Sequence, residues 1–297
     1  MELVPLGPGF GAELRGVDLI DVASSDAAYR ALREAFEEHS VVVFRDQEVS
    51  DDVQVGFSRA FGPLERTKVG LQAAGSFYVR VTNIVPVGDN AGGTAGGTAP
   101  PDHRQTLINK ANRLWHTDSS FKATPALASI LSARIVPDTG GETEFTSTRL
   151  AWERLPESQQ AKLRDLVVSH SYANSRNQVD PKLMTPEERA ALPPVRWRMT
   201  WHNPANGRTA LYVASHAGAI EGMDEAEAKA LLASLIEGAA PESGTYVHRW
   251  RAGDVVLWDN RATMHRGWPW PGDQPRLLVR TTVSARDVDG LDSVRPG

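Results

Sequence analysis

Three residues of this chain, His116, Asp118 and His265, have the side-chain types and the spacing of a transition-metal site. A His-x-Asp pair followed at long range by another histidine is the ligand set of a two-histidine, one-carboxylate facial triad. Such a triad on one face of a ferrous ion leaves the opposite positions open for a chelating cosubstrate and dioxygen. The chain contains no cysteine, so a transition metal must be held by imidazole and carboxylate. An open hydrolytic zinc site is the alternative, because an isolated His-x-Asp occurs often by chance.

Two arginines follow the second histidine at a spacing that brings them together. If residues 277–284 form a strand, positions 276, 278 and 280 share one face, so Arg276 and Arg280 reach the same cavity. A buried guanidinium needs a carboxylate, which it grips through two parallel hydrogen bonds. The pair therefore predicts two acidic ligands beside the metal. The alternative is that one of them, more readily Arg280, pairs with an internal aspartate or glutamate.

The elements that would position these residues are mostly short strands. Apolar and β-branched runs predict strands over residues 41–44, 78–84, 126–136, 142–145, 167–172, 195–201, 209–213, 245–251, 254–258 and 277–284. Helical spacing of apolar residues predicts helices over 26–39, 50–61, 149–166 and 224–237, the third of them broken near Pro156. This pattern is typical of a double-sheet barrel. We therefore expect a mainly β fold with peripheral helices, a jelly roll, in a single domain over residues 1–297.

The metal pair is expected to lie on a strand of this barrel. Residues two apart on a strand point to the same side, so His116 and Asp118 would both face the interior. His265 would arrive across the barrel mouth from a late strand or from the loop after it. The segment over residues 85–110 precedes the pair and begins with a run rich in Gly, Ala, Thr and Pro. Such a composition is typical of a mobile loop, and we expect an active-site lid there.

The charge of the chain limits the classes of partner. The formal net charge is -5 and the isoelectric point is near 5.9, whereas nucleic acid and anionic membranes call for a basic surface. No apolar run approaches the roughly 18 residues needed to span a bilayer. The first residues lack the basic and apolar regions of a secretory signal. We therefore expect a cytoplasmic protein that acts on a small molecule.

Ordered segments along the chain resemble one family, the ferrous iron and 2-oxoglutarate dependent dioxygenases that act on taurine and 2,4-dichlorophenoxyacetate. The segments lie at residues 16–19, 39–47, 57–64, 115–121, 140–145 and 258–261. The segments that look closer to the phenoxyacetate branch lie at residues 114–121, 172–176 and 191–195. The resemblance covers nearly the full length. It implies a double-stranded β-helix, which agrees with the fold that the strand pattern predicts.

Carried over position by position, the resemblance implies roles for individual residues. It implies that His116, Asp118 and His265 bind the iron. It also implies that Arg276 pairs with the distal carboxylate of 2-oxoglutarate and that the Thr143 hydroxyl assists it. The presence of Asp118 favours hydroxylation, because related halogenases have a small residue at that position.

Further residues are expected on the substrate side of the site. Arg280 matches the family's arginine for the acidic group of the primary substrate, and Asn112 matches a polar substrate contact. His202 and His216 could also touch substrate, although a structural or surface role is favoured for both. The loops around residues 65–110 and 172–190 are expected to set specificity. A homodimer or homotetramer is what the family suggests.

We therefore expect a Fe(II)- and 2-oxoglutarate-dependent dioxygenase that uses O2 to hydroxylate a small carboxylic acid. An aryloxyacetate is the leading substrate class, and its cleavage would give a phenol and glyoxylate, with succinate and CO2 from the cosubstrate. A taurine-like sulfonate is the alternative within the same chemistry, since Arg280 would serve either anion. A metal hydrolase would leave Arg276 and Thr143 unexplained. A non-catalytic acid-binding protein is disfavoured by the intact triad and both arginines.

Overall fold

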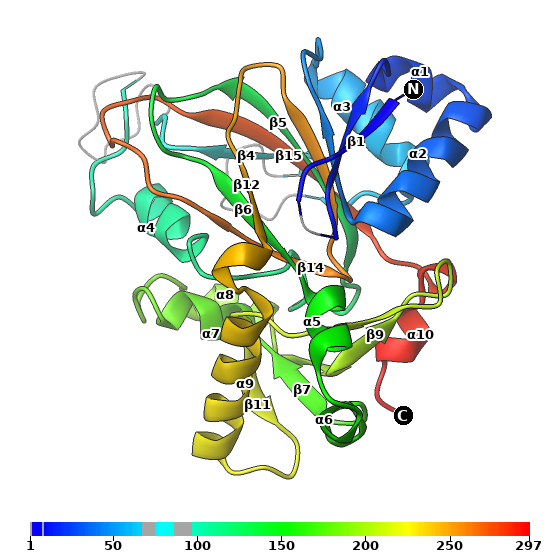
Figure 1. The fold of residues 1–297 in the computed structure, drawn as a ribbon. Coiled ribbons are helices and arrows are strands. Elements are labelled where there is room, and N and C mark those ends of the chain that lie inside the picture. Colours follow the sequence, from blue (N-terminus) through cyan, green and yellow to red (C-terminus); the bar gives the residue numbers. More distant parts are fainter. Residues whose placement is uncertain (1, 8, 67–74, 86–96) are drawn as a thin grey trace.

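Two facing β-sheets form the centre of the molecule, seen in a computed structural model that describes residues 2–7, 9–66, 75–85 and 97–297 (Figure 1). The larger sheet has the spatial order β1 (Glu2–Pro5), β2 (Ala12–Arg15), β3 (Val41–Phe44), β13 (Val255–Asp259), β5 (Ala126–Ile135), β15 (Leu277–Ser284) and β4 (Val79–Thr82). The smaller sheet has the order β12 (Thr245–His248), β6 (Thr143–Ser147) and β14 (Thr263–Gly267). All these neighbours pair antiparallel except β2 with β3. The predicted mainly β jelly roll with peripheral helices is confirmed.

The strand β3 is buried on both faces, and its residues are consecutively apolar. Val42 and Phe44 pack in one apolar cluster, beneath the helices of the outer face. Val41 and Val43 pack in another, between the two sheets, where they share a core with Phe145 of β6. Successive side chains of a strand point to opposite faces, so one short strand supplies both cores. This arrangement explains the uninterrupted apolar run in the sequence.

Three helices cover the outer face of the larger sheet (Figure 1). They are α1 (Leu19–Ser24), α2 (Asp26–His39) and α3 (Asp51–Phe61). The side chains of Ser25 and Ser50 accept backbone hydrogen bonds at the N-termini of α2 and α3, which fixes where these helices begin. Apolar residues of all three helices pack against the sheet in the cluster that contains Val42 and Phe44. The helices therefore close the jelly roll on one side.

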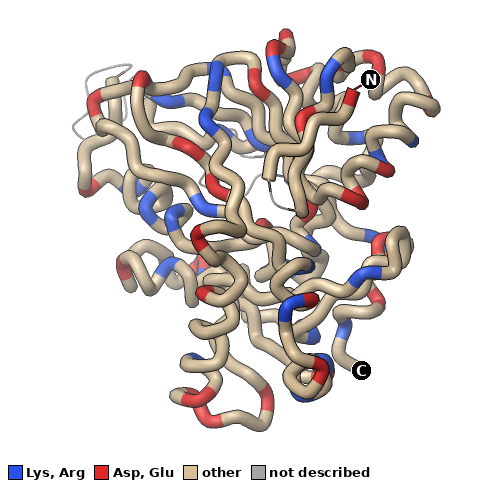
Figure 2. The backbone as a smooth tube through the Cα atoms, in the orientation of Figure 1, with Lys and Arg blue, Asp and Glu red and all other residues tan. Residues whose placement is uncertain are grey.

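Residues of both charge signs are interspersed along the backbone (Figure 2). Acidic residues outnumber basic ones, 37 to 32, over the whole chain. Within the part of the chain that the structure describes, no helix is both long and apolar enough to cross a membrane.

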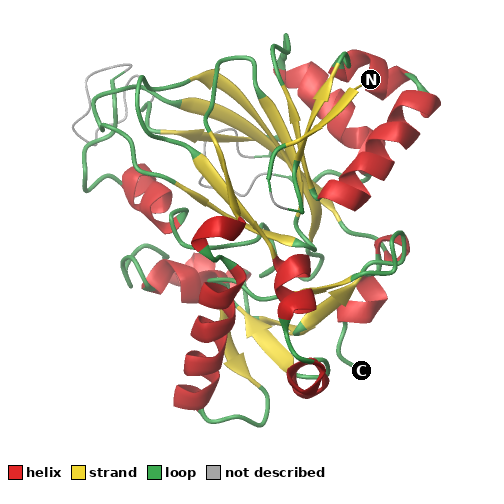
Figure 3. Ribbon diagram, viewed as in Figure 1, coloured by secondary structure: helices red, strands yellow, loops and turns green. Residues whose placement is uncertain are grey.

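The segment between β6 and β12 forms a second lobe next to the jelly roll (Figure 3). Its helices are α5 (Thr148–Arg154), α6 (Glu157–Leu163), α7 (Tyr172–Asn177), α8 (Pro186–Ala191) and α9 (Glu225–Ala239), and its strands are β7 (Val167–His170), β8 (Val195–Arg198), β9 (Thr200–His202), β10 (Thr209–Leu211) and β11 (Ala217–Ile220). The apolar cluster of this lobe includes Met264 of β14. The lobe therefore packs directly on the strand that carries His265.

Several predicted elements are confirmed with their bounds, among them α2, β3 and β15. The helix predicted over 149–166 is broken at Pro156 into α5 and α6, as expected. The strands predicted over 167–172 and 245–251 are shorter, since residue 172 begins α7 and β12 ends at residue 248. Of the predicted lid, residues 86–96 lie outside the described residues. Its C-terminal part contains α4 (Arg104–Ala111).

Candidate metal centre and active site

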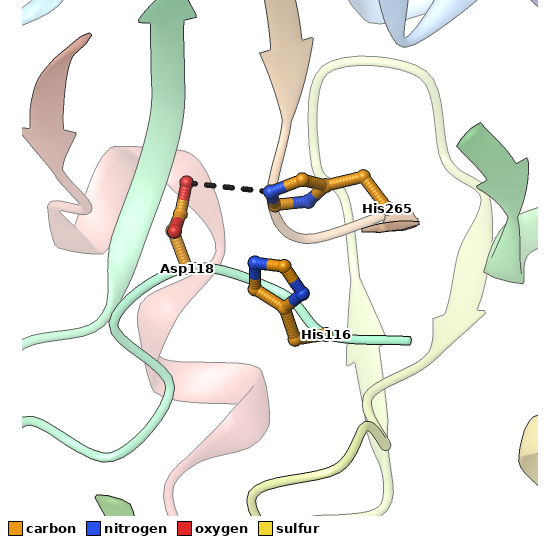
Figure 4. A group of neighbouring side chains, drawn as sticks. All are labelled: His116, Asp118 and His265. Atoms are coloured by element: carbon orange, nitrogen blue, oxygen red, sulfur yellow. Dashed lines mark ion pairs between the residues drawn. The ribbon is translucent and has the colours of Figure 1, made fainter. Parts of the chain in front are cut away.

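His116, Asp118 and His265 point toward one another in the interior of the molecule (Figure 4). Each offers one ligand atom, and these atoms lie within 4.8 Å of one another. Nε2 of His265 is 3.9 Å from Oδ2 of Asp118. The three residues are 8%, 5% and 5% exposed, in chain order. The structure therefore brings together the three residues whose spacing suggested a metal site.

A short backbone contact holds the two histidines side by side. His116 donates its backbone N–H to the carbonyl of His265 at 3.0 Å, and His265 donates to the carbonyl of His116 at 2.8 Å. The expectation that His116 and Asp118 share a strand is wrong. Only this single bridge forms at His116, and the chain then turns through Asp118 to Ser119, which has a φ of 57°. The pairing with β14, rather than strand alternation, places the ligand atoms together.

Asp118 is fixed by a hydrogen-bonded ring that includes Ser129 of β5 and Asn260. The Ser129 hydroxyl donates to Oδ2 of Asp118 at 2.7 Å, and the backbone N–H of Asp118 donates to Oδ1 of Asn260 at 3.1 Å. Asn260 closes the ring by donating its Nδ2 to the Ser129 hydroxyl at 3.0 Å. Such outer partners orient metal ligands. The turn after β13 therefore supports Asp118.

The protonation states of the three residues suit a metal. Burial lowers the pKa of both His116 and His265, so each imidazole is neutral. Burial opposes ionisation of Asp118, but the charge of Arg280, together with the hydrogen bond from Ser129, outweighs it and holds the pKa well below its usual range. Nδ1 of His116 lies 2.8 Å from the Leu114 carbonyl. That contact assigns the proton to Nδ1 and leaves Nε2 as the ligand atom.

The donor set fits a divalent transition metal. Two neutral imidazoles and a carboxylate are the ligands that ferrous iron takes in a facial triad. Nδ1 of His265 is buried with no hydrogen-bond partner among the described residues. No hydrogen bond within the described residues occupies Nε2 of either histidine. The two ring atoms nearest the carboxylate are thus open for coordination.

Arg280 already has a protein partner in this structure. Its Nη1 donates to Oδ1 of Asp118 at 2.5 Å, and the arginine is about a quarter exposed at its side chain. Its Nε is buried without a partner among the described residues. The alternative of an internal carboxylate partner, left open on the sequence alone, is therefore the one observed for Arg280.

Arg276 lies deeper and meets no carboxylate in the part of the chain described. Its Nη2 donates to the Gly141 carbonyl at 3.0 Å, while its Nε is buried without a partner. Burial lowers the pKa of Arg276 to about 10. The guanidinium carbon stands 4.8 Å from the centroid of the Trp270 ring. A buried cation with unused donors is costly unless an anion joins it.

Thr143 stands beside Arg276 with its hydroxyl oriented by a neighbour. Trp250 donates its Nε1 to the Thr143 oxygen at 3.0 Å, so the hydroxyl proton is free to be donated to a ligand. Gly141 leaves the room for this arrangement. A Cβ at that position would lie 3.1 Å from Nε of Arg276, and the φ of +75° disfavours any other residue. Both residues that the resemblance assigned to 2-oxoglutarate thus line one cavity with His116 and His265.

Two adjoining cavities meet at the triad. One, of about 50 Å³, contains Thr143 and Arg276, and the other, of about 110 Å³, contains Asp118. His116, Asn112 and Arg280 line both. Asn112 follows α4 directly and is held through its backbone carbonyl, which accepts a hydrogen bond from Gly267 at 2.9 Å. The expected cosubstrate and substrate residues therefore surround the metal candidates from two sides.

The second lobe supplies further cavity residues. Arg176 of α7 and His216, just before β11, line the larger cavity together with Phe121. His216 is 2% exposed, and its ring centroid is 6.4 Å from that of His116. The sequence favoured a structural or surface role for His216. Its position in the cavity wall instead favours contact with a ligand. The only sequence signal for Arg176 was the resemblance of the segment 172–176.

A buried triad of two histidines and one carboxylate, inside a jelly roll and beside an unpaired guanidinium, defines a class of protein. That class is the non-haem metal oxygenases that use an acidic cosubstrate. Comparison with known proteins makes the class specific.

A family model described as "Taurine catabolism dioxygenase TauD, TfdA family" matches residues 2–282. An alpha-ketoglutarate-dependent 2,4-dichlorophenoxyacetate dioxygenase of Cupriavidus pinatubonensis is 38% identical over 281 residues, which is 94% of this chain and 96% of that protein. An (S)-phenoxypropionate/alpha-ketoglutarate-dioxygenase of Delftia acidovorans is 31% identical and covers 96% of each chain. The crystal structure of AAD-2 in complex with Mn(II) and N-oxalylglycine matches with a TM-score of 0.85 and 36% identity, covering 96% of this chain and 98% of that one.

This chain belongs to the TauD/TfdA dioxygenase family. It is an alpha-ketoglutarate-dependent dioxygenase, an oxidoreductase that uses Fe(II), 2-oxoglutarate and O2. The family, the enzyme class and the cofactors predicted from the sequence are confirmed. N-oxalylglycine has the same chelating oxalyl group as 2-oxoglutarate, so its presence with a metal in the similar structure agrees with this cofactor use. Family membership sets aside the metal hydrolase and the non-catalytic binding protein.

Proposed function

We propose that this dioxygenase hydroxylates an aryloxyacetate-type acid and so cleaves it to a phenol and glyoxylate. The observation that carries the proposal is the larger cavity, where aromatic residues and arginines stand beside the triad. Its aromatic residues are Phe77, Phe121 and Tyr172. Aromatic walls suit the ring of such a substrate, and a guanidinium suits its carboxylate. The similarity to dioxygenases named for phenoxy acids supports the same substrate class.

In this proposal His116, Asp118 and His265 hold the ferrous ion. When bound with 2-oxoglutarate and O2, the ion supplies the oxidant that places oxygen on a substrate C–H bond. The protein's part is to fix positions. Ser129 and Asn260 keep Asp118 in place, and the backbone pairing of His116 with His265 keeps the imidazoles together.

Arg276 and Thr143 bind the distal carboxylate of 2-oxoglutarate in the smaller cavity. The free Nε of Arg276 and the free proton of the Thr143 hydroxyl are the donors. Trp250 donates to the hydroxyl oxygen and orients it, so the hydroxyl proton stays available for the ligand. An anion at this place would neutralise a guanidinium that the described protein leaves unpaired.

Arg280 and Asn112 contact the primary substrate on the other side of the triad. They hold the acid so that the carbon between its carboxylate and its ether oxygen faces the metal. Hydroxylation of that carbon gives a hemiacetal. Its C–O bond to the aryl oxygen then breaks, the phenol leaves with a proton, and glyoxylate remains. Succinate and CO2 come from the cosubstrate.

A comparison of acids tests the proposed function. The purified enzyme is supplied with Fe(II), 2-oxoglutarate and air, and succinate is measured with phenoxyacetate and with taurine. We expect phenoxyacetate to stimulate succinate release and to yield equal amounts of phenol and glyoxylate. Stimulation by taurine alone would replace the proposal with a sulfonate substrate. An enzyme that neither acid stimulates would contradict both.

Three further expectations stay proposals. We propose that the chain assembles as a homodimer or homotetramer, that it is located in the cytoplasm, and that residues 1–297 act as a single domain with no nucleic-acid or membrane partner. Size-exclusion chromatography with light scattering tests the first. A monomer at micromolar concentration would contradict it.

A further inference from the structure

Arg176 is a buried cation without an acidic partner in the part of the chain that the structure describes. It comes from α7 of the second lobe and lines the same cavity as His116, Asp118 and Arg280. Arg176 is only 8% exposed, and its Nε is buried with no hydrogen-bond partner among the described residues. Leaving a guanidinium in such a place costs free energy unless an anion completes it.

Two other buried arginines of the described chain have acceptors within the protein, although Nε of Arg149 is also without a partner. Arg261 forms ion pairs with Asp259 at 2.9 Å and with Glu37 at 2.7 Å. Arg149 donates to backbone carbonyls at the end of α2. Within the described residues the Arg176 side chain has no hydrogen bond or ion pair, and its guanidinium carbon stands 4.3 Å from the centroid of the Tyr172 ring. A stacked ring orients a guanidinium but leaves its in-plane N–H donors unused.

The surroundings of Arg176 point to an aromatic acid. The ring centroid of Tyr172 lies 4.7 Å from that of Phe121, which lies 4.8 Å from that of His216. Because the His216 ring neighbours that of His116, an aromatic wall runs from the arginine toward the triad. An aryl ring can pack on this wall while its acidic group reaches the guanidinium. In an aryloxyacetate the reacting carbon is bonded to the carboxylate carbon. The anion must therefore bind close to the metal, in the cavity that Arg176 shares with the triad.

Arg280 is less free to take that anion alone. Its Nη1 is engaged with Oδ1 of Asp118 at 2.5 Å, which ties this arginine to a candidate metal ligand. A substitution of Arg280 would therefore disturb the ligand as well as the substrate. Arg176 forms no hydrogen bond or ion pair with a member of the triad, and only its charge acts on His116. The two arginines thus differ in what each can do for the reaction.

We propose that Arg176 binds the carboxylate of the primary substrate and selects acids over neutral analogues, while Arg280 shares the anion and orients Asp118. The inference rests on the proposed function, because it specifies how the acidic substrate is held. The proposal places a specificity residue in the second lobe. The metal ligands that the sequence indicated lie elsewhere, in β14 of the jelly roll and in the segment between α4 and β5.

The test is steady-state kinetics of Arg176→Gln with phenoxyacetate. We expect the KM for phenoxyacetate to rise roughly 10- to 100-fold, which is the value of a charge-assisted hydrogen bond. The KM for 2-oxoglutarate and the kcat at saturating acid should change by less than about threefold. Inhibition by phenoxyacetamide, a neutral analogue of the same shape, should be unaffected. Arg176→Lys should recover part of the loss, because it keeps the charge without the paired donors.

Arg80→Gln is the matched control, since it removes a positive charge from the rim of the same cavity, where the side chain is 39% exposed. Its KM for phenoxyacetate should stay within about threefold of the wild type, because solvent screens a charge at the rim. Arg280→Gln should differ from both by weakening Fe(II) binding and lowering kcat.

An unchanged KM for phenoxyacetate in folded Arg176→Gln would overturn the inference. So would a rise in KM that phenoxyacetamide inhibition follows equally, since that would mean a loss of shape rather than of charge. Where circular dichroism shows that the glutamine variant does not fold, Arg176→Lys decides: a wild-type KM there would overturn the inference. Failure of the wild-type enzyme to respond to any aryloxy acid would instead contradict the proposed function.

Discussion

The two sides of the active site are built in opposite ways. On the metal side, Asp118 is held by Ser129, Asn260 and Arg280, so its position is set within the protein. On the cavity side, Nε of Arg276 and Nε of Arg176 are buried with no hydrogen-bond partner among the described residues. Buried polar groups are nearly always paired in folded proteins. The difference indicates that paired groups hold Asp118 in place, whereas the arginines that line the cavities keep donors available for acids.

The largest effect should follow from removing a metal ligand. His116→Ala deletes one imidazole of the triad, so substrate-dependent succinate formation should fall by roughly a thousandfold or more. Thermal unfolding should be little affected if the variant keeps the fold. His202→Ala, at an exposed histidine, serves as the control and should keep its activity. Retention of activity by His116→Ala would refute the metal assignment.

On the cavity side, Arg276→Gln should weaken the binding of 2-oxoglutarate. Because the buried guanidinium would lose charge-assisted hydrogen bonds to the distal carboxylate, the KM for 2-oxoglutarate should rise about 100-fold. Fe(II) affinity measured without 2-oxoglutarate should stay near that of the wild type. A variant with normal 2-oxoglutarate saturation would show that the unpaired guanidinium is only structural.

On the metal side, Ser129→Ala should weaken Fe(II) binding by roughly 10- to 100-fold, the usual cost of losing an outer partner of a metal ligand. Ser132→Ala on the same strand is the matched control. Ser132 is also buried, but its hydroxyl donates to Gln54 at 2.7 Å, away from the triad. Both variants should lose some stability, and only Ser129→Ala should lose metal affinity. Equal metal affinity in the two would break the comparison.

A smaller effect is expected from Trp250→Phe, which keeps an aromatic ring and removes the donor to Thr143. The Thr143 hydroxyl would then be free to rotate away from the cosubstrate. The KM for 2-oxoglutarate should rise about three- to tenfold, the value of one ordinary hydrogen bond. At saturating 2-oxoglutarate, kcat should be unchanged. A fall in kcat with an unaltered KM would argue against this role.

A buried histidine outside the site sharpens the comparison through pH. Burial lowers the pKa of His170 to about 3, from an ordinary value of 6.5. Below pH 6.5 the unfolded chain takes up a proton that the folded chain refuses, so stability falls as pH drops from about 6.5 toward 3. Between pH 7 and 5.5 the loss from this group is about 1 kcal/mol.

Urea unfolding of wild type and His170→Phe at the two pH values isolates this contribution. The variant should lose about 1 kcal/mol less than the wild type on acidification. Activity at pH 7 is expected to be preserved if the variant folds, because His170 lines neither cavity of the active site. An identical pH dependence for the two proteins would show that His170 is not held neutral in the folded state.

The sequence predicted those features of the fold that depend on local signals. Ser25 and Ser50 stand where the helices α2 and α3 begin, because a serine hydroxyl caps a helix from its own sequence position. The alternation of β15 placed Arg276 and Arg280 toward one cavity, since the period of a strand needs no partner to be read.

Features set by distant partners could not be predicted in the same way. The turn at Asp118 depends on pairing of His116 with His265 and on the amide of Asn260, both far away in the sequence. Arg176 reaches the cavity because the second lobe packs against β14. The residues near position 176 carry no local pattern that predicts this packing. Tertiary contacts of this kind override local preference.

Anaerobic titration with Fe(II) and 2-oxoglutarate tests the central claim most directly. The wild type should bind one ferrous ion per chain, and 2-oxoglutarate should bind far more tightly once the ion is present. His265→Ala, examined alongside, should lose Fe(II) affinity by more than about 100-fold and with it the metal-dependent gain in 2-oxoglutarate affinity. A His265→Ala protein that binds both as the wild type does would contradict the account.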